Sequence, residues 1–172
     1  MKKSLITTII ILPGNVLILI PGLILFFTKE NVYSANFFLN LFSPYDSLMW
    51  LSLPFFIIGL IFAFTTSILF LNEGKGTPAP WAPQKKLVVK GPYRYVRNPM
   101  IISVLFMLIG ESLIFGSYPL LIWTFFFFTL NSIYFPLFEE KTLEKKFGKK
   151  YIDYKKNVPR WLPRLTPWDP YD

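Results

Sequence analysis

The chain has 172 residues, of which 53% are hydrophobic and 19% aromatic, and its 18 Lys and Arg against 10 Asp and Glu give a formal net charge of +8. A soluble domain of this size could not bury so much apolar surface, so the composition predicts an integral membrane protein. The sequence has no cysteine, which excludes disulfides, thiolate nucleophiles and iron–sulfur ligation. It also has no histidine, the commonest general base and zinc ligand.

Four apolar segments are candidate membrane spans, residues 5–27, 48–71, 100–115 and 118–138. About 20 helical residues cross a hydrocarbon core of about 30 Å, so only the third segment is short. The first segment follows Lys2 and Lys3 but is too long for a signal peptide and has no cleavage site before Lys29, so we expect it to be retained. Only Gly116-Ser117 separates the last two segments, which predicts a tight antiparallel helical hairpin.

Basic residues are distributed unevenly between the connections. The connection of residues 28–47 has Lys29 as its one basic residue, whereas most of the Lys and Arg lie in the tail after Phe138 and in the connection of residues 72–98. Because basic loops stay in the cytoplasm, the distribution predicts that both termini and the second connection are cytoplasmic. We therefore expect localisation in the cell membrane with both ends inside.

Two cytoplasmic stretches differ in their expected structure. The glycines and prolines of residues 73–83 predict a loop. In the tail, Leu143, Phe147 and Tyr151 follow each other at intervals of four residues, which predicts an amphipathic helix that continues from the last span. Such a helix would lie along the membrane surface with its lysines toward anionic headgroups. The expected fold class is thus all-α integral membrane, with about four transmembrane helices and a cytoplasmic amphipathic C-terminal helix.

The segment GPYRYVRNPM, residues 91–100, precedes the third span. Asn98 and Pro99 are typical of an N-cap and a first helical residue. Arg94 and Arg97 would then lie just outside a helix N-terminus, where free N–H groups and guanidinium groups favour an anion such as a carboxylate or phosphate. The structural alternative is a role as interfacial anchors for the two arginines and two nearby tyrosines, Tyr93 and Tyr95.

Three carboxylates are further candidates. Glu139 and Glu140 follow the last span, where one of them could accept two hydrogen bonds from a diol such as a ribose; the alternative is a solvated pair at the start of a charged helix. Glu111 is the one acidic residue inside a predicted span, a position that usually indicates function. It also lies about one turn from the end of that span, so contact with water is the structural alternative.

The common nucleotide motifs are missing. The sequence has no GxGxxG fingerprint after a strand, no GxxxxGK[ST] phosphate loop and no Ser/His/Asp set. We expect no metal site and no nucleic-acid partner. Any nucleotide-like cofactor must be held in another way.

The order of the segments GTPAPWAP, KKLVVKGPYRYVRNPM, GESLIFGS and FEEKTLEKKFGKKYIDYKKNVPRWLP resembles the isoprenylcysteine carboxyl methyltransferase family and the related phospholipid N-methyltransferases. The resemblance extends over about residues 73–165. It implies that S-adenosylmethionine is the methyl donor and binds on the cytoplasmic side, between the last spans and the tail. Many members of the family have histidine where this chain has Asn98, and often tyrosine where it has Ile101, so a mechanism that needs this histidine is not expected here.

The resemblance also implies the residues of the site. Those implied to bind the cofactor are Tyr93, Tyr95, Arg97, Asn98, Pro99, Glu139, Glu140, Arg160 and Trp161. Those implied to act in catalysis are Arg97, Asn98 and Glu140.

The resulting prediction is one membrane domain, with an N-terminal transmembrane pair in residues 1–72 and a methyltransferase-like region in residues 73–172. It would transfer a methyl group from S-adenosylmethionine to a lipophilic acceptor, a carboxylate or an amine. Membrane lipids are the other expected partner, and the oligomeric state stays open. The alternatives are a membrane reductase of the sterol-reductase kind that uses NADPH, and a non-catalytic adaptor whose basic face binds anionic lipid.

Overall fold

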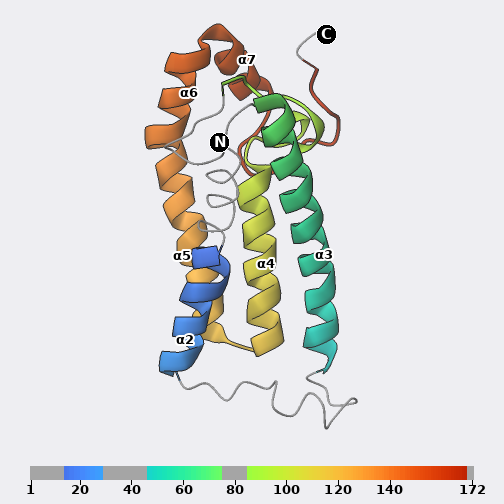
Figure 1. Cartoon of the computed structure of the whole chain (residues 1–172), viewed down its shortest axis with the longest axis vertical. Helices are drawn as coiled ribbons and strands as arrows, with labels where there is room; N and C mark the ends of the chain where they lie inside the picture. Colours follow the sequence, from blue (N-terminus) through green and yellow to red (C-terminus); the bar gives the residue numbers. More distant parts are fainter. Residues whose placement is uncertain (1–13, 29–45, 75–84, 170–172) are drawn as a thin grey trace.

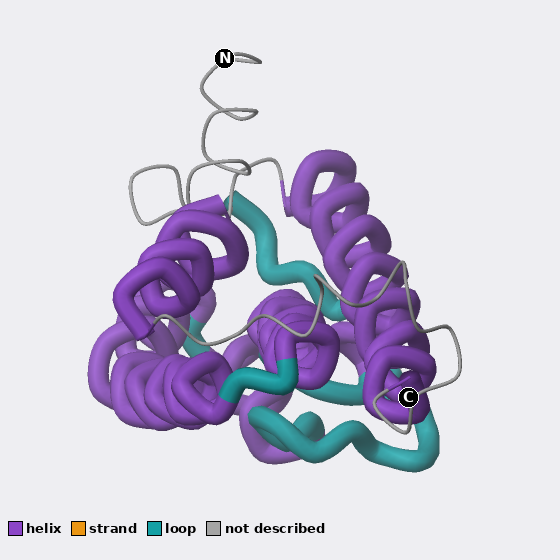
Figure 2. Tube along the Cα trace, turned by 90° about the horizontal axis from the view of Figure 1, so that it is seen from below, coloured by secondary structure: helices purple, strands orange, loops and turns teal. Residues whose placement is uncertain are grey.

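The structure, a computed structural model, describes residues 14–28, 46–74 and 85–169. The start of the first predicted span, the connection between the first two spans and the GTPAPWAP segment lie outside the described residues. Every regular element in the described ranges is helical, as Figure 2 shows. The predicted all-α fold class is therefore confirmed for this part of the chain.

The helical elements follow one another in the predicted order. They are η1 (Asn15–Leu19), α2 (Ile20–Thr28), α3 (Asp46–Leu69), η3 (Phe70–Gly74), η4 (Gly91–Arg94), α4 (Pro99–Phe115), α5 (Tyr118–Tyr134), η5 (Phe135–Glu139), α6 (Glu140–Phe147) and α7 (Lys149–Asn157). Of the elements named η, η4 is a 3₁₀ turn and the others are π-helical stretches that continue or precede an α-helix. Helix α4 packs against α3 and α5, and α2 packs against α5 (Figure 1).

The α4–α5 hairpin has the turn that the sequence predicts. Gly116 ends α4 with φ +57°, a left-handed conformation that favours glycine. The backbone N–H of Ser117 donates to the Ser112 carbonyl oxygen over 3.0 Å, and the Ser117 side chain accepts from the Leu120 N–H at the start of α5. Both helix ends are thus capped within a two-residue turn, which makes α4 and α5 antiparallel neighbours.

Small residues let α3 and α4 approach closely. A Cβ atom on Gly59 of α3 would lie 2.7 Å from Met107 Cγ and 3.0 Å from the Ser103 carbonyl oxygen of α4. A Cβ atom on Gly110 of α4 would lie 2.7 Å from the Phe56 ring. Close approach through glycine and serine is the usual way in which helices associate where lipid removes the hydrophobic driving force.

The outer faces of the long helices are apolar. Phe64 on α3 and Phe125 on α5 are each 71% exposed, an arrangement that suits contact with lipid rather than water. Two helices, Trp50–Gly74 and Tyr118–Phe147, are long and apolar enough to cross a membrane, while Asn15–Thr28 and Pro99–Phe115 are shorter. The 30-residue helix is about 45 Å long, which exceeds a hydrocarbon core of about 30 Å. Its last turns, from Glu139 onward, therefore extend beyond the core.

The tail differs from its predicted structure. A helix does continue from the last span, as predicted, but it ends at Phe147, and α7 is separated from α6 at Gly148, whose φ of +56° favours glycine. The apolar side of both helices packs within the protein, where the buried Tyr151, Tyr154 and Val158 contact Leu87, Val89, Leu143, Phe147 and Trp168. The prediction of a single helix with its apolar stripe on the membrane is therefore wrong. Leu87 and Val89, which precede η4, and Trp168, near the end of the described chain, cover that stripe.

We expect Gly59→Val to lower the stability of the protein by about 1 to 3 kcal/mol, because the added side chain overlaps the backbone of α4. The matched control is Gly22→Val in α2, where a Cβ atom would meet no described atom within 4 Å. Thermal unfolding of both variants in detergent measures the difference. Equal unfolding temperatures would contradict the close α3–α4 contact.

Candidate functional site

Several segments of the chain meet at one end of the helices. The N-terminus of α4, the C-terminal end of the α5–α6 helix and α7 lie there together (Figure 1). After α7 the chain returns alongside the segment that precedes α4, held by three backbone hydrogen bonds: Arg97 N to Pro159 O (2.9 Å), Arg164 N to Tyr95 O (2.9 Å) and Trp168 N to Arg94 O (3.0 Å). This C-terminal return segment, residues 158–169, places Arg160 and Trp161 beside the start of α4.

A π-helical stretch lies directly before the first carboxylate of α6. Pro136 has no N–H group to donate to the preceding turn, so the helix widens over Phe135–Glu139. A wider turn rotates the residues that follow it relative to α5. Glu140, the first residue of α6, is buried, whereas its neighbour Glu139 is partly exposed. Stretches of this kind are frequent at functional sites.

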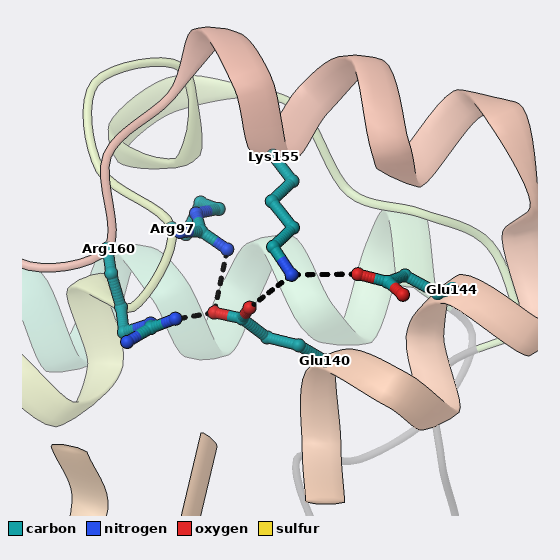
Figure 3. Close-up of polar contacts among 5 residues, drawn as sticks. All are labelled: Arg97, Glu140, Glu144, Lys155 and Arg160. Carbon is teal, nitrogen blue, oxygen red and sulfur yellow. Dashed lines mark hydrogen bonds and ion pairs between the residues drawn. The ribbon is translucent and has the colours of Figure 1, made fainter. Parts of the chain in front are cut away.

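The Glu140 carboxylate is the centre of an ion-pair cluster (Figure 3). Its Oε1 accepts from Arg97 Nη1 and from Arg160 Nε, each over 2.7 Å, and its Oε2 lies 2.9 Å from Lys155 Nζ. Lys155 Nζ also lies 2.8 Å from Oε1 of Glu144, one turn further along α6. Three cations thus face two carboxylates, which leaves the cluster with a net positive charge.

Burial and charge set the protonation of these groups. The Glu140 side chain is 2% exposed and that of Arg97 9%. Burial raises the pKa of Glu140, but the hydrogen bonds from Arg160 and Lys155 and the charge of Arg97 outweigh it and hold the pKa below its usual value. Hydrogen bonds to Glu144 and Glu140 raise the pKa of Lys155. Glu140 and Lys155 are therefore both ionised at neutral pH.

Glu139 differs from Glu140 in its environment. Burial and the neighbouring Glu140 charge raise the pKa of Glu139 to about 7. Glu139 makes no ion pair or hydrogen bond with any residue that the structure describes. The two adjacent carboxyl groups thus have different capacities, since one is held in ion pairs and the other remains able to accept or give up a proton near neutral pH.

Asn98 and Pro99 occupy the N-cap and first position of α4, as predicted. The Asn98 side chain makes no capping hydrogen bond. Instead its Nδ2, like Nε of the adjacent Arg97, is buried without a hydrogen-bond partner among the described residues. Unpartnered buried donors are costly and rare, so these two atoms indicate a place where a ligand could supply acceptors.

The other residues predicted for the site lie around this cluster in different ways. Tyr93 is buried, and its carbonyl oxygen accepts from the Tyr154 hydroxyl over 2.7 Å. Pro99 is fully buried at the start of α4, and Tyr95 is exposed. The Trp161 ring packs against two rings of the α5–η5 helix, those of Phe128 (5.3 Å between centroids) and Phe135 (5.9 Å).

Arg94 does not join Arg97. Its Nη2 lies 2.7 Å from Asp169 Oδ2 and its Nε donates to the Trp168 carbonyl oxygen over 2.9 Å. The structure therefore separates the two arginines that the sequence pattern had grouped at one anion site. Arg97 lies in the ion-pair cluster, whereas Arg94 attaches the end of the return segment.

Lys155 and Glu144 were not among the predicted site residues. The interval of four residues between Glu140 and Glu144 is visible in the sequence and predicts a shared helix face. Nothing in the sequence pairs that face with Lys155, because the pairing depends on the reversal of the chain at Gly148. The tail contains several other lysines that fit the sequence pattern equally well.

We expect Glu140→Gln to lower the stability of the protein by about 3 kcal/mol or more, because it leaves the buried Arg97 charge without its counterion. Glu144→Gln is the matched control, since the ion pair that Glu144 makes within the described residues is with Lys155, whose side chain is partly exposed; we expect a change below about 1 kcal/mol. Thermal unfolding in detergent tests both. Equal losses in the two variants would contradict the central position of Glu140.

The comparison with known proteins gives one family. The family model described as phospholipid methyltransferase matches residues 47–150. The matched range contains α3, α4, α5 and α6, and with them Arg97, Asn98, Glu139 and Glu140, and it ends before the return segment. No curated protein and no solved structure matches the chain. Because the family model covers more than half of the sequence, the chain belongs to the phospholipid methyltransferase family.

Proposed function

We propose that this protein is an integral membrane methyltransferase that uses S-adenosylmethionine to methylate a lipophilic acceptor at the cytoplasmic membrane face. Family membership supports methyl transfer in a membrane. The observation that carries the proposed site is the pair of buried, unpartnered donors, Arg97 Nε and Asn98 Nδ2, at the N-terminus of α4. They lie next to an ion-pair cluster at the end of the α5–α6 helix.

The residues at this end of the protein fit the polar groups of S-adenosylmethionine. Its carboxylate and its ring nitrogens are acceptors, which suit Arg97 Nε and Asn98 Nδ2. Its amino and ribose hydroxyl groups are donors, which suit a carboxylate without an ion pair, such as Glu139. The net positive charge of the cluster around Glu140 favours the cofactor carboxylate further.

Glu140 would act as a positioning residue. It holds Nη1 of Arg97 and Nε of Arg160 on one oxygen, so both guanidinium groups are fixed before any ligand binds. Fixed donors bind a ligand with a smaller loss of entropy than mobile ones. The packing of Trp161 against Phe128 and Phe135 would exclude water on the side of the α5–η5 helix.

Methyl transfer from a sulfonium needs little acid–base catalysis from the protein. When bound, S-adenosylmethionine supplies an activated methyl group on a sulfonium, so alignment and exclusion of water can provide much of the rate. Asn98 cannot exchange a proton near neutral pH, unlike the histidine common at this position in the family. A carboxylate acceptor needs no base, and an amine acceptor needs only to be neutral, a requirement that Glu139, with its pKa raised to about 7 by burial and the charge of Glu140, could help to meet.

The alternatives explain less. A reductase that uses NADPH would have to bind a dinucleotide without the GxGxxG fingerprint, and the family match favours a methyl donor. A non-catalytic adaptor would explain the basic surface but gives no reason for unpartnered donors buried beside α4.

The acceptor would reach the site from the bilayer, along the apolar outer faces of the helices, while the charged donor would enter from the cytoplasm.

We expect the purified protein to transfer labelled methyl from S-adenosylmethionine into a component of a lipid extract. The product, separated and identified by mass spectrometry, distinguishes methylated carboxylates from methylated amines. Heat-denatured protein is the control for chemical methylation. Absence of transfer into every fraction of extracts from several sources would overturn the proposed activity.

We expect Asn98→Ala to weaken the binding of S-adenosylhomocysteine about tenfold, because the loss of one hydrogen bond in a buried site lowers affinity by about that factor. We expect no loss of thermal stability. Stability should be kept because Nδ2 of Asn98 makes no hydrogen bond with any described residue and the side chain does not cap α4. Asn157→Ala, at an exposed hydrogen bond of α7, is the control that should leave binding unchanged. Calorimetry measures both; unchanged binding in Asn98→Ala would remove Asn98 from the cofactor site.

A further inference from the structure

The outward face of the α5–α6 helix changes character at Phe138. Tyr134 and Phe138 are 43% and 60% exposed, and their rings stack with centroids 5.6 Å apart. Lys141 and Lys145, which follow at intervals of three and four residues, are also exposed. Residues three or four apart lie on the same side of a helix, so an aromatic stripe continues directly into a pair of lysines.

This change occurs at the height expected for a membrane surface. Phe138 lies about 30 Å along the helix from Tyr118, the exposed tyrosine at its other end, which equals the thickness of a hydrocarbon core. Lys141 and Lys145 follow about 5 and 11 Å further on, within or just above a headgroup layer of about 5 to 7 Å. Lysine side chains can bend back over such distances.

Lys141 and Lys145 form no ion pair with any residue that the structure describes. The two acidic residues of α6, Glu140 and Glu144, both contact Lys155 (Figure 3). Their carboxylates are therefore already engaged, while Lys141 and Lys145 have no ion-pair partner among the described residues.

We propose that Tyr134, Phe138, Lys141 and Lys145 form a binding site for an anionic phospholipid of the surrounding bilayer. The lysines contact the headgroup phosphate, and an acyl chain lies along the two stacked rings. Basic residues next to a membrane helix attract anionic lipids, and aromatic rings are favoured at the headgroup level. The occupant is a lipid rather than a free anion because the apolar and cationic parts are continuous. The proposal does not depend on methyl transfer.

The test is a titration of the full-length protein in detergent with dansyl-labelled phosphatidylglycerol, followed by energy transfer from the tryptophans. Phosphatidylcholine with the same label and acyl chains is the comparison lipid. We expect saturable binding that is tighter for phosphatidylglycerol. Lys141→Gln with Lys145→Gln should weaken it about twenty-five-fold, at about fivefold per lysine. Lys149→Gln with Lys150→Gln, which removes the same charge from exposed positions of α7, should change it little.

Three results would overturn the site. They are equal affinity for the two lipids, an equal loss in both double variants, and displacement of the lipid by equimolar inorganic phosphate, which would show an anion site without a lipid component. Thermal unfolding verifies that each variant is folded. Should the double variant not fold, the single variants Lys141→Gln and Lys145→Gln each have to weaken binding about fivefold for the proposal to stand.

Discussion

The Glu140 carboxylate, 2% exposed, accepts hydrogen bonds from Arg97 and Arg160 and pairs with Lys155. Arg97 lies in the segment before α4, and Lys155 and Arg160 lie in α7 and the return segment that follows it, so one acidic side chain connects the tail with a segment 43 residues before it in the sequence. An ion this deeply buried is stable only when its charge is matched and its hydrogen bonds are made. The arrangement of this end of the protein therefore depends on Glu140.

The same interaction determines the properties of the surfaces on both sides of the α5–α6 helix. Toward the protein, it holds Nη1 of Arg97, while Nε of that residue and Nδ2 of Asn98 are buried without partners among the described residues. On α6, Glu140 and Glu144 are both engaged by Lys155, while Lys141 remains exposed. The proposed cofactor site and the proposed lipid site thus both adjoin the ion pairs of these two carboxylates.

The arrangement of the apolar helices depends on close contacts at small residues. Helices α3 and α4 associate through Gly59 and Gly110, where a larger side chain would collide with Met107 or Phe56. Since lipid is as apolar as a leucine side chain, such close packing is what selects one arrangement of the helices. The two-residue turn at Gly116-Ser117 then orients α5 relative to α4, and with it the carboxylates at the far end of that helix.

The sequence by itself determined the all-α class, the hairpin at Gly116 and the position of Asn98 and Pro99 at the start of α4, because hydropathy, turn glycines and helix caps act over a few neighbouring residues. It also indicated Arg97 and Glu140 through their place in a family pattern. Only the tertiary structure decided that Arg97 pairs with Glu140 while Arg94 pairs with Asp169, that Lys155 joins the cluster, and that the apolar side of the tail packs on the protein instead of the membrane. Each of these depends on the reversals of the chain at Gly148 and after α7, whose directions arise from contacts between distant residues that no local pattern encodes.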